Sequence, residues 1–146
     1  MSRLTRTLGL IVCFASLSAP SIFADDDQAS GPWKVVNYWS ITCAPCRVEI
    51  PELNRLHDEF EPRETLLVGV NFDDDERART MMLADRLGIR FPTLRRDEVE
   101  KLGVTDPSVL PTTVILAPDG TEKARLVGAQ TRDDIQQQLR ALRINE

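Results

Sequence analysis

The sequence predicts an α/β domain in which a central mixed β-sheet is flanked by helices on both faces. Short runs rich in β-branched and aromatic residues alternate with segments of helical periodicity, which favours parallel strand pairing. The last two such runs are joined by a tight turn, which adds antiparallel strands. The length of 146 residues, with 42% hydrophobic and 28% charged side chains, suits one folded domain.

Residues 1–24 have the layout of a secretory signal peptide. Two arginines precede an apolar run of ten residues, and an acidic stretch begins at Asp25. Cleavage after Ala24 and export to the periplasm are therefore predicted. An uncleaved N-terminal anchor is the alternative, because the apolar segment is at the short limit for a membrane span, and only that form would contact the membrane. Residues 25–32 are predicted to form a flexible lead-in, and residues 33–146 are predicted to form the folded domain.

The first half of the domain predicts two strands and two helices. Residues 33–39 and 65–71 are short and rich in β-branched residues, as buried strands are. The segment from Cys43 to about Phe60 has helical spacing of its apolar residues, which are Val48, Ile50, Leu53, Leu56 and Phe60. The acidic run 73–76 is expected to open a second helix, to cap it and to meet the positive end of its dipole.

The second half predicts shorter elements and a hairpin. Residues 91–94 predict an extended piece and residues 96–102 a brief helical turn. Strands over 112–117 and 122–127 flank the turn sequence Pro-Asp-Gly-Thr. A final amphipathic helix begins at about Arg132, and its apolar face holds Ile135, Leu139 and Leu142.

Charge and metal-ligand patterns exclude several classes of function. The formal net charge of −5 argues against nucleic-acid binding, which needs a basic surface. The acidic run 73–76 lacks the glycine and the distant glutamate of a calcium-binding EF-hand loop. A zinc site would need two further ligands beside one cysteine pair, and His57 is the only histidine. No metal and no cofactor are therefore expected.

The chemistry is predicted at Cys43 and Cys46, which enclose Ala44 and Pro45. Because Cys43 follows a strand and begins a helix, unpaired N–H groups and the helix dipole favour its thiolate and lower its pKa. Cys46 lies one turn further along and is expected to be more buried. Cys43 is thus the predicted attacking thiol and Cys46 the resolving thiol. A purely structural disulfide is the alternative, although so short a loop stabilises a fold only weakly.

The segment 37–51, with the sequence NYWSITCAPCRVEIP, resembles the active-site block of exported thioredoxin-like thiol-disulfide oxidoreductases of the TlpA and ResA type. The cytochrome c maturation thioredoxins are relatives of that type. Further matches follow in order at residues 68–71, 88–92, 102–104, 110–113 and 118–120. The resemblance implies a thioredoxin fold and client proteins that carry disulfides. It also implies a reductive role, with electrons from a membrane protein of the DsbD or CcdA type.

The resemblance assigns roles to further residues. The peptide bond before Pro111 is expected to be cis, and the backbone of Leu110 to hydrogen-bond an extended client segment. Glu49 matches an acid of the ResA type and could transfer protons or raise thiol pKa values by like charge. A solvated helix glutamate is the alternative for Glu49. Asn37 stands where cytosolic thioredoxins carry a buried aspartate.

Client binding is also expected to involve the residues around the cysteines. Trp39 is expected to pack beside the disulfide. Thr42 stands where the family usually has tryptophan, and Ala44-Pro45 differs from the family's common dipeptides. These departures leave client preference and reduction potential open.

Two other functions remain open at this stage. A peroxiredoxin-like peroxidase shares the implied fold, but its P-x-x-x-T-x-x-C arrangement is absent from the sequence. A copper chaperone of the Sco type needs a distant histidine ligand, whereas His57 lies on the helix that carries the cysteines. The direction of electron flow is open as well, because an oxidant such as DsbA uses the same parts.

Overall fold

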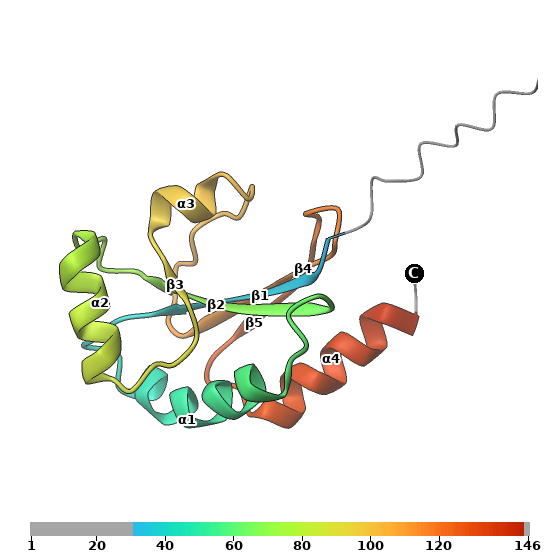
Figure 1. Ribbon diagram of the computed structural model, residues 1–146, viewed down its shortest axis with the longest axis horizontal. Coiled ribbons are helices and arrows are strands. Elements are labelled where there is room, and N and C mark those ends of the chain that lie inside the picture. The colour runs from blue at the N-terminus through green and yellow to red at the C-terminus, as the bar shows by residue number, and fades with distance from the viewer. Residues whose placement is uncertain (1–30, 145–146) are drawn as a thin grey trace, which may run out of the picture.

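The computed structural model describes residues 31–144, so the predicted signal peptide and most of the predicted lead-in lie outside the described residues. One sheet of five strands is flanked by helices (Figure 1). The elements are, in chain order, β1 (Trp33–Trp39), α1 (Ala44–Glu59), β2 (Thr65–Asn71), α2 (Arg77–Arg86), β3 (Thr93–Leu94), α3 (Arg96–Glu100), β4 (Thr112–Leu116), β5 (Glu122–Val127) and α4 (Arg132–Ile144).

The sheet has the order β3-β2-β1-β4-β5, so β1 lies at its centre. Strand β1 pairs in parallel with β2 and antiparallel with β4, while β3 adds to β2 and β5 to β4. Helices α1 and α4 lie on one side of the sheet and α3 on the other, as Figure 1 shows. The predicted mixed sheet with helices on both faces is confirmed.

Strand β1 is mostly apolar because both of its faces are buried, and its two polar residues are Lys34 and Asn37. Val35 belongs to the core between the sheet and helices α1 and α4, which also contains Leu53, Leu56, Ile115, Ile135 and Leu139. Val36, its neighbour, points to the opposite face. It belongs to the core on the α3 side, together with Tyr38, Val70, Val99, Val104, Val114 and Leu116. This central strand leads directly into the cysteine-bearing helix.

The predicted apolar face of α1 is wrong for one residue, Val48. Val48 is 74% exposed, whereas Cys46 and Ile50 are 0% and 2% exposed. Successive helical residues are about 100° apart, so a residue two positions from a core-facing residue points away from the core. Val48 is two positions from both Cys46 and Ile50. The buried face of α1 runs instead through Cys46, Glu49, Ile50, Leu53, Asn54 and Leu56.

The acidic run also behaves differently from the prediction. Helix α2 begins after it, at Arg77, with no acidic residue in its first turn and no hydrogen bond from the side chain of Glu76, its N-cap residue. Asp73 instead accepts hydrogen bonds from Ser40, and Asp75 accepts one from Asn71. The carboxylates therefore fix the loop after β2 rather than cap the helix.

Candidate active site

The cysteine pair lies where β1 passes into α1. Cys43 is the N-cap residue of α1, with φ −81° and ψ 102°, and its Sγ accepts a hydrogen bond from the backbone N–H of Cys46 at 3.2 Å. Pro45 fits the first turn of the helix, where no intrahelical N–H is needed. Cys43 and Cys46 form a disulfide across a Cα–Cα distance of 5.3 Å.

The two cysteines differ in accessibility. Cys46 has no exposed surface, whereas Cys43 is partly exposed. Thr42, Ala44 and Pro45 are all exposed around it. Cys43 is therefore the sulfur that an incoming molecule can reach, and Cys46 is shielded inside the protein.

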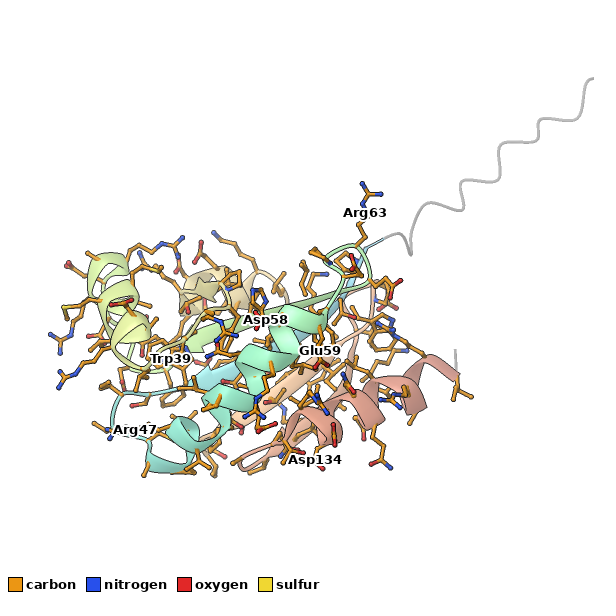
Figure 2. All side chains as sticks on the ribbon, turned by 60° about the horizontal axis from the view of Figure 1, so that its bottom comes forward. Trp39, Arg47, Asp58, Glu59, Arg63 and Asp134 are labelled. Atoms are coloured by element: carbon orange, nitrogen blue, oxygen red, sulfur yellow. A yellow bond between two sulfur atoms is a disulfide. The ribbon has the colours of Figure 1, made fainter. Side chains whose placement is uncertain are left out.

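A buried apolar cluster lies behind the disulfide. Trp39, Cys46, Leu83 and Ala84 form this cluster, and Leu110 packs against it. Trp39 has no exposed surface, so its ring packs within this cluster and not on the surface of the protein. Figure 2 shows Trp39 and Arg47 at the same end of the molecule, where the cysteine helix starts.

Glu49 is buried beside the cysteine helix. Its side chain is 1% exposed and accepts hydrogen bonds from Asn37 Nδ2 at 2.8 Å and from the backbone N–H of Gln130 at 2.9 Å. Asn37 Nδ2 also donates to Thr113 Oγ1 at 3.0 Å. Burial raises the pKa of Glu49 from 4.5 to about 7, although both hydrogen bonds act in the opposite direction. Glu49 is thus not a solvated helix glutamate, and it shares the buried face of α1 with Cys46.

The segment before β4 completes the surroundings of the disulfide. The Leu110–Pro111 peptide bond is cis. Leu110 and Cys43 are both partly buried and pack against the same apolar cluster. Pro111 is buried, and its carbonyl oxygen accepts a hydrogen bond from the N–H of Gly128 at 2.9 Å. Four of the predicted site residues, Trp39, Cys43, Cys46 and Leu110, thus meet at one cluster.

Several supporting residues were not found from the sequence. Ser40, Asp73 and Arg47 hydrogen-bond the turn that leads into Cys43, and Gln130 binds Glu49. Serine and aspartate are common in turns that their side chains stabilise, which was the available signal for Ser40 and Asp73. The backbone contact of Gln130 has no sequence signal, because any residue carries that N–H.

A metal-binding cluster and a membrane-spanning helix are both absent between residues 31 and 144. No group of three or more histidine, cysteine, aspartate or glutamate side chains in this range is placed to hold a metal ion. Within the same range, no helix is both long enough and apolar enough to cross a membrane.

Comparison with known families places the chain. The AhpC/TSA family model matches residues 22–124. The chain belongs to the AhpC/TSA family. Among curated relatives, it is 29% identical over 110 residues to the thiol-disulfide oxidoreductase ResA of Geobacillus thermodenitrificans, covering 74% of this chain and 62% of the relative. It is 34% identical over 121 residues to the thiol:disulfide interchange protein HelX of Rhodobacter capsulatus, covering 82% of this chain and 65% of that protein. The chain thus spans a little under two thirds of the length of these relatives.

Solved structures confirm the fold. StoA from Bacillus subtilis superposes with a TM-score of 0.62 at 19% identity, covering 74% of this chain and 82% of StoA. A putative thioredoxin from Neisseria meningitidis gives a TM-score of 0.65 at 16% identity, covering 83% and 81% of the two chains. The predicted thioredoxin fold is therefore confirmed for this member of the AhpC/TSA family.

Proposed function

We propose that this chain is an exported thiol-disulfide oxidoreductase that reduces disulfides in client proteins. One observation carries the proposal: a partly exposed cysteine at a helix N-cap is bonded to a fully buried cysteine one turn further along. This asymmetry suits an attacking and a resolving thiol. The printed names of the relatives, thiol-disulfide oxidoreductase and thiol:disulfide interchange protein, support the same reaction class.

The reaction begins from the reduced dithiol. The Cys43 thiolate attacks one sulfur of a client disulfide, forms a mixed disulfide and releases the first client thiolate. The Cys46 thiolate then attacks Cys43 Sγ, closes the Cys43–Cys46 disulfide and releases the second client thiolate. Two electrons pass to the client, and the two client sulfurs take up protons. An external dithiol returns the protein to its reduced state.

Glu49 serves as the proton acceptor for Cys46 in this scheme. Cys46 has to lose its proton before it attacks the mixed disulfide, and its buried sulfur is shielded from water. Glu49 lies three residues along on the same buried face, and its pKa of about 7 suits proton exchange near neutral pH.

The client is expected to bind across the exposed end of α1 and the segment before β4. Thr42, Ala44 and Pro45 offer exposed surface beside Cys43, and Leu110 lies partly exposed at the same cluster. We propose that an extended client segment pairs with the backbone of Leu110 next to Pro111. Trp39 is buried and supports this surface from behind.

The periplasm is the proposed location. It rests on the signal-peptide pattern of residues 1–24, which precede the described part of the chain. The proposed electron donor is a membrane protein of the DsbD or CcdA type, because an exported dithiol needs a source of electrons that crosses the membrane.

Reduction of insulin by dithiothreitol tests the activity. The protein is expected to accelerate precipitation of the insulin chains, and Cys43→Ser to abolish the acceleration. His57→Ala serves as the matched control on the same helix and should retain the rate. If Cys43→Ser keeps the activity, the mechanism is wrong.

Two further measurements separate this proposal from its rivals. Peroxide consumption well above that of a free thiol would indicate a peroxidase, and stoichiometric copper binding lost in His57→Ala would indicate a copper chaperone. The reduction potential gives the direction of electron flow. A value of roughly −250 mV or below supports a reductase, whereas a value near about −120 mV supports an oxidant.

A further inference from the structure

We propose that Asp73 is a positioning residue for Cys43, which it holds in place through Ser40 and the peptide of Ile41. The inference rests on the proposed role of Cys43 as the attacking thiol. Asp73 follows β2, thirty residues after Cys43 in the sequence, yet it binds the turn that connects β1 to α1.

The turn from Ser40 to Cys43 is held by hydrogen bonds of its own. The N–H of Cys43 donates to the carbonyl oxygen of Ser40 at 3.2 Å, and the N–H of Thr42 donates to Ser40 Oγ at 3.2 Å. Ser40 is 3% exposed, so its hydroxyl is buried within this turn. The hydroxyl of Ser40 therefore holds Thr42 directly, and the backbone carbonyl of the same residue holds Cys43.

Asp73, which lies outside the turn, binds the Ser40 hydroxyl. Ser40 Oγ donates to Asp73 Oδ2 at 2.8 Å, and the N–H of Ile41 donates to the same oxygen at 3.4 Å. Arg47 holds the other side of the same residue, since its guanidinium donates to the carbonyl oxygen of Ile41. Both polar groups of the Ile41 backbone are thus bound by charged side chains, one from the β2–α2 loop and one from α1.

The position of the turn matters because it determines the geometry of the Cys43 thiolate. Cys43 Sγ accepts the N–H of Cys46 only while Cys43 keeps its N-cap conformation. A looser turn lets the sulfur leave this N–H and the positive end of the helix dipole, and so destabilises the thiolate.

The elements around Cys43 carry several charged side chains, whose effect on the thiolate must be separated from that of the hydrogen bonds. Arg47 and Glu49 lie on α1, and Asp73, Asp74 and Asp75 lie in the loop after β2. Helix α2, whose Leu83 and Ala84 belong to the cluster on which Cys43 packs, carries Arg79, Asp85 and Arg86. The segment 109–111, whose Leu110 packs on the same cluster as Cys43, carries no charge. Removal of the Asp73 charge alone favours the thiolate, whereas loss of its hydrogen bonds disfavours it.

Two substitutions at one position separate charge from hydrogen bonding. Asp73→Asn and Asp73→Ala remove the same charge, but asparagine keeps one carbonyl oxygen, which can accept from both Ser40 and Ile41 as Oδ2 does. The measurement is the rate at which iodoacetamide alkylates Cys43 in the reduced full-length protein from pH 5 to pH 9, resolved by mass spectrometry.

We expect the pKa of the Cys43 thiol to be about half a unit higher in Asp73→Ala than in Asp73→Asn, so that Cys43 reacts about threefold more slowly at pH 5, below both pKa values. Ser40→Ala added to Asp73→Ala should change the profile little, because both substitutions break one chain of contacts. Asp74→Asn, which removes a charge at the next position, gives the effect of charge alone. Thermal unfolding verifies that each variant is folded.

Identical pH profiles for Asp73→Ala and Asp73→Asn would overturn the inference, and so would a full additive effect of Ser40→Ala. Alkylation needs no client and no turnover. A protein that fails to reduce insulin can therefore still show the difference between the two variants, and a protein that reduces insulin can lack it.

Discussion

Asn37 donates a hydrogen bond of 2.8 Å to Glu49 and thereby joins the central strand β1 to the helix that carries both cysteines. In cytosolic thioredoxins, by the resemblance described above, a buried aspartate occupies the position of Asn37. Here the strand supplies an amide and the helix supplies the carboxylate. The buried ionisable group is thus carried by α1 itself, one turn beyond Cys46.

The buried carboxyl of Glu49 predicts a pH-dependent stability. Glu49 holds its proton up to about pH 7 in the folded protein but only to about pH 4.5 when unfolded. The folded state binds more protons between these values, so the contribution of Glu49 to the free energy of unfolding falls as the pH rises from about 4.5 to about 7. The free energy of unfolding of the wild type should fall by up to roughly 3 kcal/mol for this reason, and that fall should be missing in Glu49→Gln. Urea unfolding across this pH range measures it. Parallel curves for the two proteins would contradict the pKa of about 7.

The same substitution tests the proton-acceptor role. In Glu49→Gln, resolution of the mixed disulfide should slow above pH 7, where the wild-type carboxylate is ionised. Formation of the mixed disulfide by Cys43 should change less, since Cys43 is partly exposed to water. Rapid-mixing kinetics with a small aromatic disulfide separate the two steps, and equal slowing of both would argue against the role.

A second carboxylate in place of Asn37 predicts like-charge repulsion. In Asn37→Asp, two buried carboxyls would lie within hydrogen-bonding distance, where both cannot ionise cheaply. The free energy of unfolding should therefore drop more at pH 8 than at pH 5, measured by urea unfolding at both values. Glu49→Gln introduced into Asn37→Asp should relieve most of this extra loss. An equal loss in both backgrounds would mean that the two groups do not interact.

Gly69 leaves room for the tryptophan behind the disulfide. A Cβ atom at this position would lie 2.8 Å from Phe91 Cε2 and 2.9 Å from Trp39 Nε1, so Gly69→Ala forces one of two buried rings to move. We expect a loss of about 1–3 kcal/mol in the free energy of unfolding. Gly31→Ala, where the nearest atom is a carbonyl oxygen at 3.3 Å, is the milder comparison. Equal stabilities of the two variants would show that the Trp39 site is looser than these distances indicate.

The two faces of α1 predict opposite sensitivities to truncation. Ile50 is 2% exposed and Val48 is 74% exposed, although they are two residues apart. Ile50→Ala should cost about 2–5 kcal/mol of unfolding free energy. Val48→Ala should change it by less than about 0.5 kcal/mol. Chemical denaturation of both variants decides the matter, and a large effect at Val48 would mean that this face of the helix is covered.

The order of strands and helices could be predicted because it depends on local composition and periodicity. The strand β1 and the helix α1 begin and end within about a residue of their predicted positions. The failures concern side chains whose partners are distant in sequence. Asp73 belongs to an acidic run of the kind that caps helices. Its carboxylate instead accepts a hydrogen bond from Ser40, which lies thirty-three residues away in the sequence.

The site was predictable for its cysteines and less so for its surroundings. The spacing of Cys43 and Cys46 indicates their chemistry without any knowledge of the fold. The burial of Glu49 depends on the loop after β5, which covers it with the N–H of Gln130, eighty-one residues away. A spacing of three residues is enough to predict that Glu49 and Cys46 share one face of a helix, but no local pattern could show that this part of the helix is covered.

The contact between Gln130 and Glu49 joins a residue near the end of the domain to the cysteine-bearing helix near its start. Chains are synthesised from the N-terminus, so the cysteine pair is complete long before residue 130 exists. The spacing of the two cysteines is a local property of the sequence, whereas the burial that raises the pKa of Glu49 exists only in the folded domain, where the N–H bond from Gln130 opposes that rise. The raised pKa of Glu49 is therefore a property of the complete fold, and an unfolded chain carries the same two cysteines beside a glutamate of ordinary pKa.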